Sequence, residues 1–379
     1  MIKMILQIIS GFLLLLITFI LLYVNLAPQF GARSKGERLE RICNSPNYRE
    51  GKFQNLIPTP MAGENTSMLK NGLKFIKSSS DRTPSSPIET IPFEMNGFLK
   101  SSEGIAFSWF GHSSLILNMN GKIILTDPVF SEKASPFSFM GLKRFDYTNQ
   151  FSAKDLPPVD LLIISHDHYD HLDYKTIIQL HKKVDKFYVP LGVAAHLIRW
   201  GVPESKITEF DWWDENSKIP GLRIVFTPAR HFSGRKGFDK DYTLWGSWVL
   251  KSEKHSVYYN GDSGYGQHFK LIGEKFGPFD LTFMECGQYN EGWPYIHMMP
   301  EQSVQAHIDL KGKIMMPIHW GKFNLSLHSW TEPIERAKKE AEKLSVELIL
   351  PKPGEIIELA NLIQNEDSKD KSEEIVLLK

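Results

Sequence analysis

The 379-residue chain has few cysteines and no net charge, and each shortage excludes a class of protein. With only Cys43 and Cys286, a disulfide framework is ruled out. Lys and Arg together number 44, as do Asp and Glu, so the chain is a poor candidate for bulk electrostatic binding of nucleic acid. Apolar residues make up 42% and charged residues 23%, which is the composition of a folded protein rather than a disordered one.

Charge is also missing from one long segment, between Lys3 and Arg33. A helix needs about twenty apolar residues to cross a bilayer, and this segment supplies them. A buried core helix would carry a polar stripe, and a cleaved signal peptide would end in an A-x-A-like site. The segment has neither feature. We therefore expect an uncleaved single-pass anchor over residues 4–26.

Basic residues on the two sides of this anchor predict its orientation. Lys3 and the terminal amine precede it, whereas four basic residues follow it: Arg33, Lys35, Arg38 and Arg41. The positive-inside rule then places the body of the chain on the cytoplasmic side, with the periplasmic side as the alternative. Unpaired cysteines are compatible with a reducing compartment.

The remainder of the chain divides into three parts by amino-acid composition and by the pattern of its apolar residues. Residues 31–100 are rich in Gly, Pro, Ser and Asn, and we expect them to wrap or link rather than fold alone. Over residues 101–360, short apolar runs of strand length recur, which predicts an α/β or α+β layered domain. Helical patterns lie between some of these runs, at 173–184, 300–310 and 332–344. Residues 361–379 form a charged tail.

The strongest chemical signal is the segment SHDHYDHLD at 165–173, directly after an apolar run. It places three imidazoles and a carboxylate within six residues: His166, His168, Asp170 and His171. Imidazole nitrogen and carboxylate oxygen are ligands of zinc. In an extended turn His166 and His168 point the same way, whereas Asp170 and His171 are expected on the first turn of the following helix. One short segment can therefore serve two metal ions.

Two metal ions need further ligands, because each takes four or more donors. His231, Asp262 and His319 each closely follow another apolar run of strand length. Any one of them alone is more simply interpreted as a surface residue. The recurrence of one arrangement, a strand end followed by a ligand, favours a metal site.

In this ordered ligand set the chain resembles the metallo-β-lactamase-fold hydrolases, over residues 105–355. The resemblance implies a four-layer αββα sandwich with the site at one edge of two sheets. It also implies two Zn²⁺ ions per chain. One ion would take His166, His168 and His231, and the other Asp170, His171 and His319, with Asp262 bridging the two.

Further blocks resemble the N-acylphosphatidylethanolamine phospholipase D group and its bacterial relatives. They are WFGHSS at 109–114, LTDPVF at 125–130, PARHFS at 228–233, GDSGY at 261–265, HMMPEQ at 297–302 and IHWGKF at 318–323. This resemblance implies a phosphodiesterase that releases N-acylethanolamine by attack of a hydroxide shared between the ions, with Asp170 and Asp262 required for turnover. A lactonase, or another hydrolase of small carboxyl or phosphate esters, is the alternative.

Several other residues are candidates for supporting roles. Asp127 and His112 are expected as buried partners of the ligands, although a turn cap and an inner histidine are the simpler interpretations. His297 resembles a position close to substrate, where it would bind the phosphate or assist proton transfer. The phospholipase group has Gln before this histidine, and here the residue is Ile296. His328 is a further candidate.

Three aromatic loops, at 137–145, 212–213 and 293–295, either contact lipid or pack against their own domain. The expected partners are thus the bilayer and a lipid or small-molecule phosphodiester, and no nucleic acid. A non-catalytic membrane scaffold would be expected to lack ligands, and the ligand set here is complete.

Overall fold

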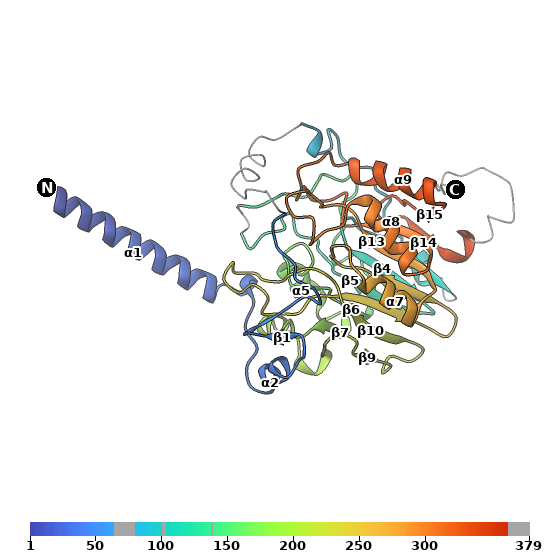
Figure 1. The fold of residues 1–379 in the computed structure, drawn as a ribbon, viewed down its shortest axis with the longest axis horizontal. Helices are drawn as coiled ribbons and strands as arrows, with labels where there is room; N and C mark the ends of the chain where they lie inside the picture. The colour runs from blue at the N-terminus through green and yellow to red at the C-terminus, as the bar shows by residue number, and fades with distance from the viewer. Residues whose placement is uncertain (64–79, 101–103, 138, 363–379) are drawn as a thin grey trace.

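The structure of the chain, a computed structural model, describes residues 1–63, 80–100, 104–137 and 139–362. Its central feature is a pair of mixed sheets that stack face to face (Figure 1). The first sheet runs in the order β16 (Ile356–Glu358), β3 (Ile105–Trp109), β4 (Leu115–Met119), β5 (Lys122–Thr126), β6 (Val159–Ile163), β7 (Val184–Pro190) and β8 (Ile207–Phe210). The second runs β15 (Glu347–Leu348), β14 (Gly312–Ile318), β13 (Phe279–Glu285), β12 (Ser256–Tyr259), β11 (Ser247–Lys251), β10 (Arg223–Thr227) and β9 (Glu215–Asn216).

Both faces of each sheet are buried. In β6, Leu161 and Ile163 belong to the apolar layer between the sheets, whereas Leu162 lies on the outer face. Across that layer Phe107 of the first sheet meets Phe283 of the second, with ring centroids 5.2 Å apart. Because both sides are covered, the sequence shows near-continuous apolar runs here instead of alternation with polar residues.

Helices cover both outer faces and complete a four-layer αββα sandwich, which confirms the expected fold class. The first sheet is covered by α4 (Met95–Lys100), α5 (Tyr174–Leu180) and α6 (Ala194–Arg199). The second is covered by α7 (His268–Phe276), α8 (Pro300–Asp309) and α9 (Glu332–Leu344), which lie together in Figure 1. Two predicted helices correspond to α8 and α9. The one predicted at 173–184 is shorter, because the chain already enters β7 at Val184.

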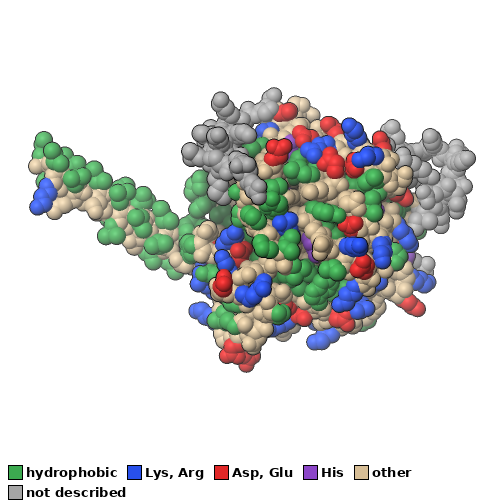
Figure 2. All heavy atoms as spheres, in the orientation of Figure 1, with side chains coloured by type: hydrophobic (Ala, Val, Ile, Leu, Met, Phe, Trp, Pro, Cys, Tyr) green, Lys and Arg blue, Asp and Glu red, His purple; other side chains and the backbone are tan. Residues whose placement is uncertain are grey.

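The N-terminal helix α1 (Ile2–Leu26) projects from the body and buries none of its side chains (Figures 1 and 2). Its 25 residues exceed the roughly 20 that a helix needs to cross the hydrocarbon core of a bilayer. By length and composition, it is therefore able to cross a membrane. Figure 2 shows apolar side chains along the whole projecting helix.

The described parts of the segment 31–100 pack on the sandwich. They include α2 (Glu37–Cys43), a hairpin of β1 (Tyr48–Arg49) and β2 (Lys52–Phe53), and the short turn η2 (Ser80–Arg82). Ile42 and Phe53 belong to the layer between the sheets, and Phe98 of α4 belongs to an outer layer. These residues extend existing cores rather than forming one of their own. Residues 64–79 and the tail from 363 lie outside the described residues, and the proposed domain boundaries remain a prediction.

The topology places the ends of several strands at one edge of the sandwich. Strands β5, β6 and β7 are parallel in the first sheet, and β12, β13 and β14 are parallel in the second. Side chains that follow the carboxyl ends of parallel neighbours meet at the same sheet edge. The predicted ligands follow β6, β10, β12 and β14, so they converge there.

Candidate metal centre

The ligand segment after β6 is a turn over its whole length. The expectation that Asp170 and His171 begin the next helix is wrong, because α5 starts only at Tyr174. Asp173 caps that helix by accepting a hydrogen bond from the backbone N–H of Lys175 at 3.2 Å. Aspartate is favoured at a helix N-cap because its carboxylate accepts from the unpaired N–H groups of the first turn. The cap therefore sets the boundary between the ligand turn and the helix.

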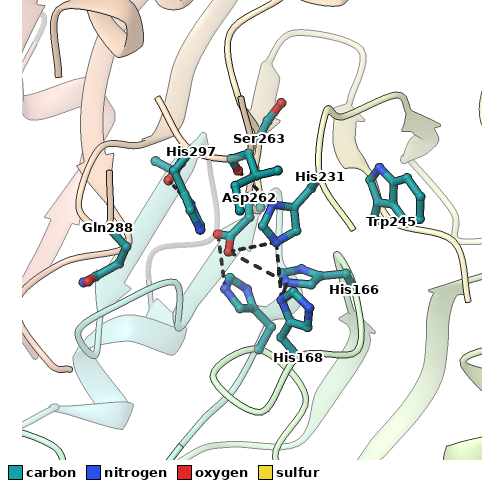
Figure 3. Close-up of polar contacts among 12 residues, drawn as sticks. His166, His168, His231, Trp245, Asp262, Ser263, Gln288 and His297 are labelled. Atoms are coloured by element: carbon teal, nitrogen blue, oxygen red, sulfur yellow. Dashed lines mark hydrogen bonds and ion pairs between the residues drawn. The ribbon is translucent and has the colours of Figure 1, made fainter. Parts of the chain in front are cut away.

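Three overlapping groups of ligand-type side chains meet at this edge, and within each group the ligand atoms all lie within 4.8 Å of one another. Two of them together hold all seven predicted ligands, and the third is Asp262, Glu285, His297 and His319. The first group is His166, His168, His231 and Asp262. Figure 3 shows these four side chains directed toward one another. The second group is His112, Asp170, His171 and His319. The structure thus brings together all seven predicted metal ligands and places His112 beside them.

Asp262 lies between the two groups. Its Oδ2 atom is 3.7 Å from Nε2 of His166 and 3.7 Å from Nε2 of His231. Its Oδ1 atom is 3.2 Å from Nε2 of both His171 and His319. One carboxylate oxygen therefore faces each group, as a bridging ligand requires.

Four buried atoms of the described residues in the two groups lack a hydrogen bond: Nδ1 of His112, Nε2 of His171, Oδ1 of Asp262 and Nδ1 of His319. Of these, Oδ1 of Asp262 lies 3.2 Å from Nε2 of His171. A buried carboxylate oxygen and a buried imidazole nitrogen are costly to leave unsatisfied, and a cation between them removes that cost. The nitrogen and oxygen donors suit a divalent metal ion of zinc type. The residues therefore fit the metal that the ligand pattern implies.

Asp127, at the end of β5, orients the second group from behind. Its Oδ2 lies 2.7 Å from Nδ1 of His171 and accepts a hydrogen bond from the Tyr259 hydroxyl at 2.7 Å. Its Oδ1 accepts from the backbone N–H of Ser165 at 2.8 Å. A carboxylate on the far nitrogen of a ligand imidazole fixes the ring and its tautomer. The structure places Asp127 where the sequence led us to expect a supporting carboxylate.

His231 is held by a backbone carbonyl and a side-chain amide rather than by a carboxylate. Its Nδ1 donates to the carbonyl of Ile296 at 2.8 Å, which leaves Nε2 facing the first group. Its backbone is paired with Asn55, whose amide both accepts from the His231 N–H at 3.1 Å and donates to the His231 carbonyl at 2.8 Å. Asn55 carries no sequence signal, because its partner lies 176 residues away.

His112 and His319 stand in two turns that are joined by backbone hydrogen bonds. The His319 N–H donates to the His112 carbonyl at 2.9 Å, and both residues have positive φ, 67° and 56°. His112 Nε2 lies 2.9 Å from Oδ2 of Asp170. Burial, with His319 nearby, lowers the pKa of His112 to about 3, so the ring is neutral and Nε2–H donates to Asp170. His112 thus supports a predicted ligand.

Glu285, the last residue of β13, is the functional residue that the sequence analysis missed. Its carboxylate is fully buried and receives the backbone N–H of Met298 at 2.8 Å. Its Oε2 lies 3.1 Å from Nδ1 of His297 and 3.3 Å from Nδ1 of His319. A ligand-type residue at a strand end was the available signal, because His231, Asp262 and His319 follow the same rule.

The ionisation of the centre follows from burial and mutual attraction. Burial opposes ionisation of Asp262, but His171 and His319 outweigh it and hold its pKa well below the usual value. Burial lowers the pKa of His231, which keeps this imidazole neutral. For His319, the attraction of Asp262 overcomes the lowering by burial and raises the pKa to about 9. A bound ion competes with that proton, since a ligand imidazole must be deprotonated.

A cavity of about 310 Å³ opens onto the two groups. His297 lines it, together with His168, Asp170, Asp262 and His319. The rest of the wall is mainly apolar: Met61, Phe232, Trp293, Ile296 and Leu325, with Gln288. Met61 comes from the N-terminal segment, so that segment contributes to the cavity directly.

The other sequence candidates divide between the cavity and the interior. Of the described residues in the three aromatic loops, only Trp293 lines the cavity. Trp212 is buried and donates to the carbonyl of Trp245 at 2.6 Å, so the loop 212–213 packs against its own domain. His328 stacks on Tyr289 with ring centroids 4.2 Å apart and belongs to neither ligand group.

The loop 137–145 lies at the end of α1. Phe137 stacks on Tyr23, near the last turn of that helix, with ring centroids 5.9 Å apart. Phe139 is 77% exposed and Met140 is 54% exposed. Ser138 lies outside the described residues. Apolar side chains next to an exposed apolar helix form a surface suited to lipid.

Comparison with known proteins was made on sequence and on structure. A family model described as a beta-lactamase superfamily domain matches residues 122–320. An uncharacterized protein of Mycobacterium tuberculosis is 41% identical over 319 residues, covering 83% of this chain and 84% of that protein. The N-acyl-phosphatidylethanolamine-hydrolyzing phospholipase D 1 of Caenorhabditis elegans is 33% identical over 253 residues, covering 63% and 70% respectively.

One solved structure illustrates the shared fold. It is an isothiocyanate hydrolase from Delia radicum gut bacteria, with a TM-score of 0.52 and 20% identity. The match covers 66% of this chain and 98% of that one. At this identity the likeness concerns the fold, and chemistry has to be argued from the site itself.

Proposed function

The chain belongs to the beta-lactamase superfamily, and from this membership we propose that it is a membrane-anchored, zinc-dependent phosphodiesterase of the phospholipase D type. The proposed substrates are N-acylphosphatidylethanolamine-like lipids. The observation that carries the proposal is the apolar cavity, which opens directly onto two ligand groups. The name of the nematode relative supports the same substrate class.

The proposed ligand roles follow the two groups. His166, His168 and His231 would hold one ion, and Asp170, His171 and His319 the other, with Asp262 between them. Two bound divalent ions would supply a water of lowered pKa and an electrostatic clamp on the phosphoryl oxygens. Asp127 and Glu285 keep the ligand rings oriented, so that little reorganisation is needed when the substrate binds.

The proposed reaction adds water across the phosphodiester. The water oxygen forms a bond to phosphorus, the bond from phosphorus to the alcohol oxygen breaks, and the products are phosphatidic acid and an N-acylethanolamine. The departing alcohol needs a proton, and His297 lines the cavity where that oxygen would lie. Glu285 accepts from His297 Nδ1–H, which leaves Nε2 of this ring to take the proton released by the attacking water and to pass it to the departing alcohol oxygen.

The wall of the cavity also favours a second candidate. Of the described residues that line it, none is Lys or Arg. A phosphate there would be neutralised by metal ions and His297 alone, whereas a neutral ester needs no more than this wall provides. A lactonase or other carboxyl-ester hydrolase is therefore the second proposed function.

The proposed membrane attachment rests on α1 and on the apolar side chains beside its end. Phe139 and Met140 would contact the lipid surface that α1 enters. We further propose the cytoplasmic side for the catalytic body, because the basic residues gather after the helix. Reporter fusions at the C-terminus, active on only one side of the membrane, test this orientation.

A lipid-extract assay tests the function. Full-length protein in detergent is incubated with a total phospholipid extract and Zn²⁺, and the products are identified by mass spectrometry. We expect N-acylethanolamines and phosphatidic acid from wild type and none from His168→Ala. His181→Ala is the matched control, because His181 is only half-buried and lies outside both groups. Formation of free fatty acid or an opened lactone instead would support the second candidate.

A further inference from the structure

The chain that leaves α1 is bound tightly to the body. We call residues 28–32 the juxtamembrane strap; they begin with the turn η1 (Pro28–Phe30), where α1 joins the body in Figure 1. The Pro28 carbonyl accepts from Nε1 of Trp200 at 2.6 Å. The Gln29 carbonyl accepts from both Nε and Nη2 of Arg235, at 3.0 and 2.9 Å.

Arg235 joins the strap to the ligand turn. Its remaining nitrogen, Nη1, donates to the carbonyl of Asp167 and, at 2.9 Å, to that of Leu172. These two carbonyls enclose three of the four predicted ligands in this segment, and the fourth, His166, directly precedes Asp167. Arg235 is 4% exposed, and its guanidinium lies 4.0 Å over the ring of Tyr169, also in that segment. One buried cation therefore spans the strap and the whole ligand turn.

His196 of α6 makes a second connection. The backbone N–H of Ala32 donates to His196 Nδ1 at 2.9 Å, so this nitrogen carries no proton and Nε2 does. His196 Nε2 then donates to Oδ2 of Asp167 at 3.2 Å. The other carboxylate oxygen of Asp167 accepts from the N–H of Gly234 at 2.7 Å. The strap thus sets the tautomer of the imidazole that holds Asp167.

Asp167 stands between two predicted ligands, His166 and His168, and its side chain points away from the metal groups toward the strap. It is 1% exposed. Because its carboxylate and its carbonyl are both held, the backbone between the two ligand histidines cannot rotate without breaking these bonds. Loosening either connection would therefore shift two ligands of the first group, His166 and His168.

Gly31 allows the strap to approach this closely. Its φ is +70°, and a Cβ at this position would collide with the imidazole ring of His196. Gly36, a few residues further along, shares the positive φ at +56°, but a Cβ added there would meet no atom within 4 Å. The two glycines therefore share the positive φ, and only at Gly31 would an added Cβ meet His196.

We propose that the juxtamembrane strap is a working part of the metal centre, with His196, Arg235 and Asp167 as positioning residues for His166 and His168. The helix α1 and the metal centre are then coupled through the strap. The segment after α1 therefore does more than attach the body to the membrane. This inference rests on the proposed metal site but not on the identity of the substrate. Residues that orient ligands from behind change metal affinity by about 10–100-fold when they are replaced.

The experiment measures Zn²⁺ release from the full-length protein in detergent. Wild type, Gly31→Ala and Gly36→Ala are loaded with Zn²⁺ and mixed with a chromophoric chelator, and the release rate is recorded. We expect Gly31→Ala to release Zn²⁺ at least about tenfold faster, with Gly36→Ala close to wild type. Equal rates for Gly31→Ala and wild type, or for the two glycine variants, would overturn the proposal.

A double-mutant cycle distinguishes an effect of Gly31→Ala through His196 from a general destabilisation of the fold. His196→Ala removes the hydrogen bonds of this ring and also the ring atoms that a Cβ at position 31 would meet, so it should also speed Zn²⁺ release. Adding Gly31→Ala to His196→Ala should then have little further effect. Additive effects would show that the glycine acts by another route and would contradict the proposal. Thermal unfolding of each metal-free variant separates loss of fold from loss of metal. A wild-type protein that retains no Zn²⁺ would overturn this inference together with the proposed function, whereas a wild type that binds Zn²⁺ but cleaves no phospholipid leaves it standing.

Discussion

Oδ2 of Asp127 lies 2.7 Å from Nδ1 of His171, and neither side chain is accessible to solvent. Asp127 belongs to neither ligand group, yet it determines which way the His171 ring faces. The same oxygen accepts from Tyr259, which reaches it from the second sheet. The centre is therefore built from both sheets, with its orientation fixed in the layer between them.

Replacing Asp127 with Asn should weaken metal binding by about 10–100-fold, because His171 loses a charged acceptor on its far nitrogen. Metal affinity is measured by competition with a chelator of known strength. The exposed Asp185→Asn is a suitable control, since this carboxylate lies on the surface at the beginning of β7. An unchanged affinity in Asp127→Asn would show that Tyr259 and Ser165 suffice to hold the site.

Asp170→Asn and Asp262→Asn should differ in metal content. Asp170 faces only the second group, so its loss should empty that group while the first keeps its ion. Asp262 presents one oxygen to each group, so its loss should weaken both. Elemental analysis of the purified variants checks this, with circular dichroism to show that both are folded. Equal metal content in the two variants would contradict the bridging role, and in both turnover should be abolished.

Glu285→Gln and His297→Gln should both impair turnover, because both act through the His297 ring. Loss of a general acid costs roughly 10²–10⁴-fold in rate, so we expect His297→Gln to fall in that range. Glu285→Gln should lower kcat through the same ring, and the double variant should be little worse than His297→Gln alone. Metal content is measured first, because Glu285 also contacts His319. If the losses of turnover in the two single variants multiply in the double variant, Glu285 and His297 act independently, which would contradict this prediction.

Stability should depend on pH through His307 of α8. This ring is buried beside Thr282, and burial lowers its pKa to about 4 from 6.5. Below pH 6.5 the unfolded chain binds a proton that the folded chain does not, so this contribution is full above pH 6.5 and is lost as pH falls toward 4. The difference corresponds to about 3 kcal/mol.

Thermal unfolding of wild type and His307→Gln between pH 4 and 7 measures this contribution. The variant should show a flatter dependence on pH than wild type, while His181→Gln, at a half-buried position, should follow wild type. Parallel curves for wild type and His307→Gln would show that folding does not lower the pKa of His307.

Sequence reasoning located the centre because its chemistry is concentrated in short, regular signals. Four ligands fall within six residues, and the other three stand at strand ends in chain order. The sandwich was predictable for a related reason: strands buried on both faces, such as β6, are near-continuous apolar runs. Glu285 follows the strand-end rule as well, but a single carboxylate in an apolar run is too small a signal by itself.

What the sequence could not show depends on contacts between distant segments. Ala32 meets His196 from 164 residues away, and Asn55 meets His231 from 176. Such pairs are chosen by the packing of the sandwich, and no local pattern of residues marks them. The N-terminal segment therefore has the sequence pattern of a linker, although it contributes Met61 to the cavity and hydrogen bonds to the ligand turn. The helix start at Tyr174 was misplaced because Asp173, the true cap, follows three residues that suit either a turn or a helix.

The most direct test of the account is hydrolysis in ¹⁸O-labelled water. Full-length protein, Zn²⁺ and vesicles of defined N-acylphosphatidylethanolamine are incubated, and the products are analysed by mass spectrometry. The account predicts one ¹⁸O atom in phosphatidic acid, none in the N-acylethanolamine, and no products after chelation or with His168→Ala. Label in a released fatty acid, or product formation that survives chelation, would contradict it.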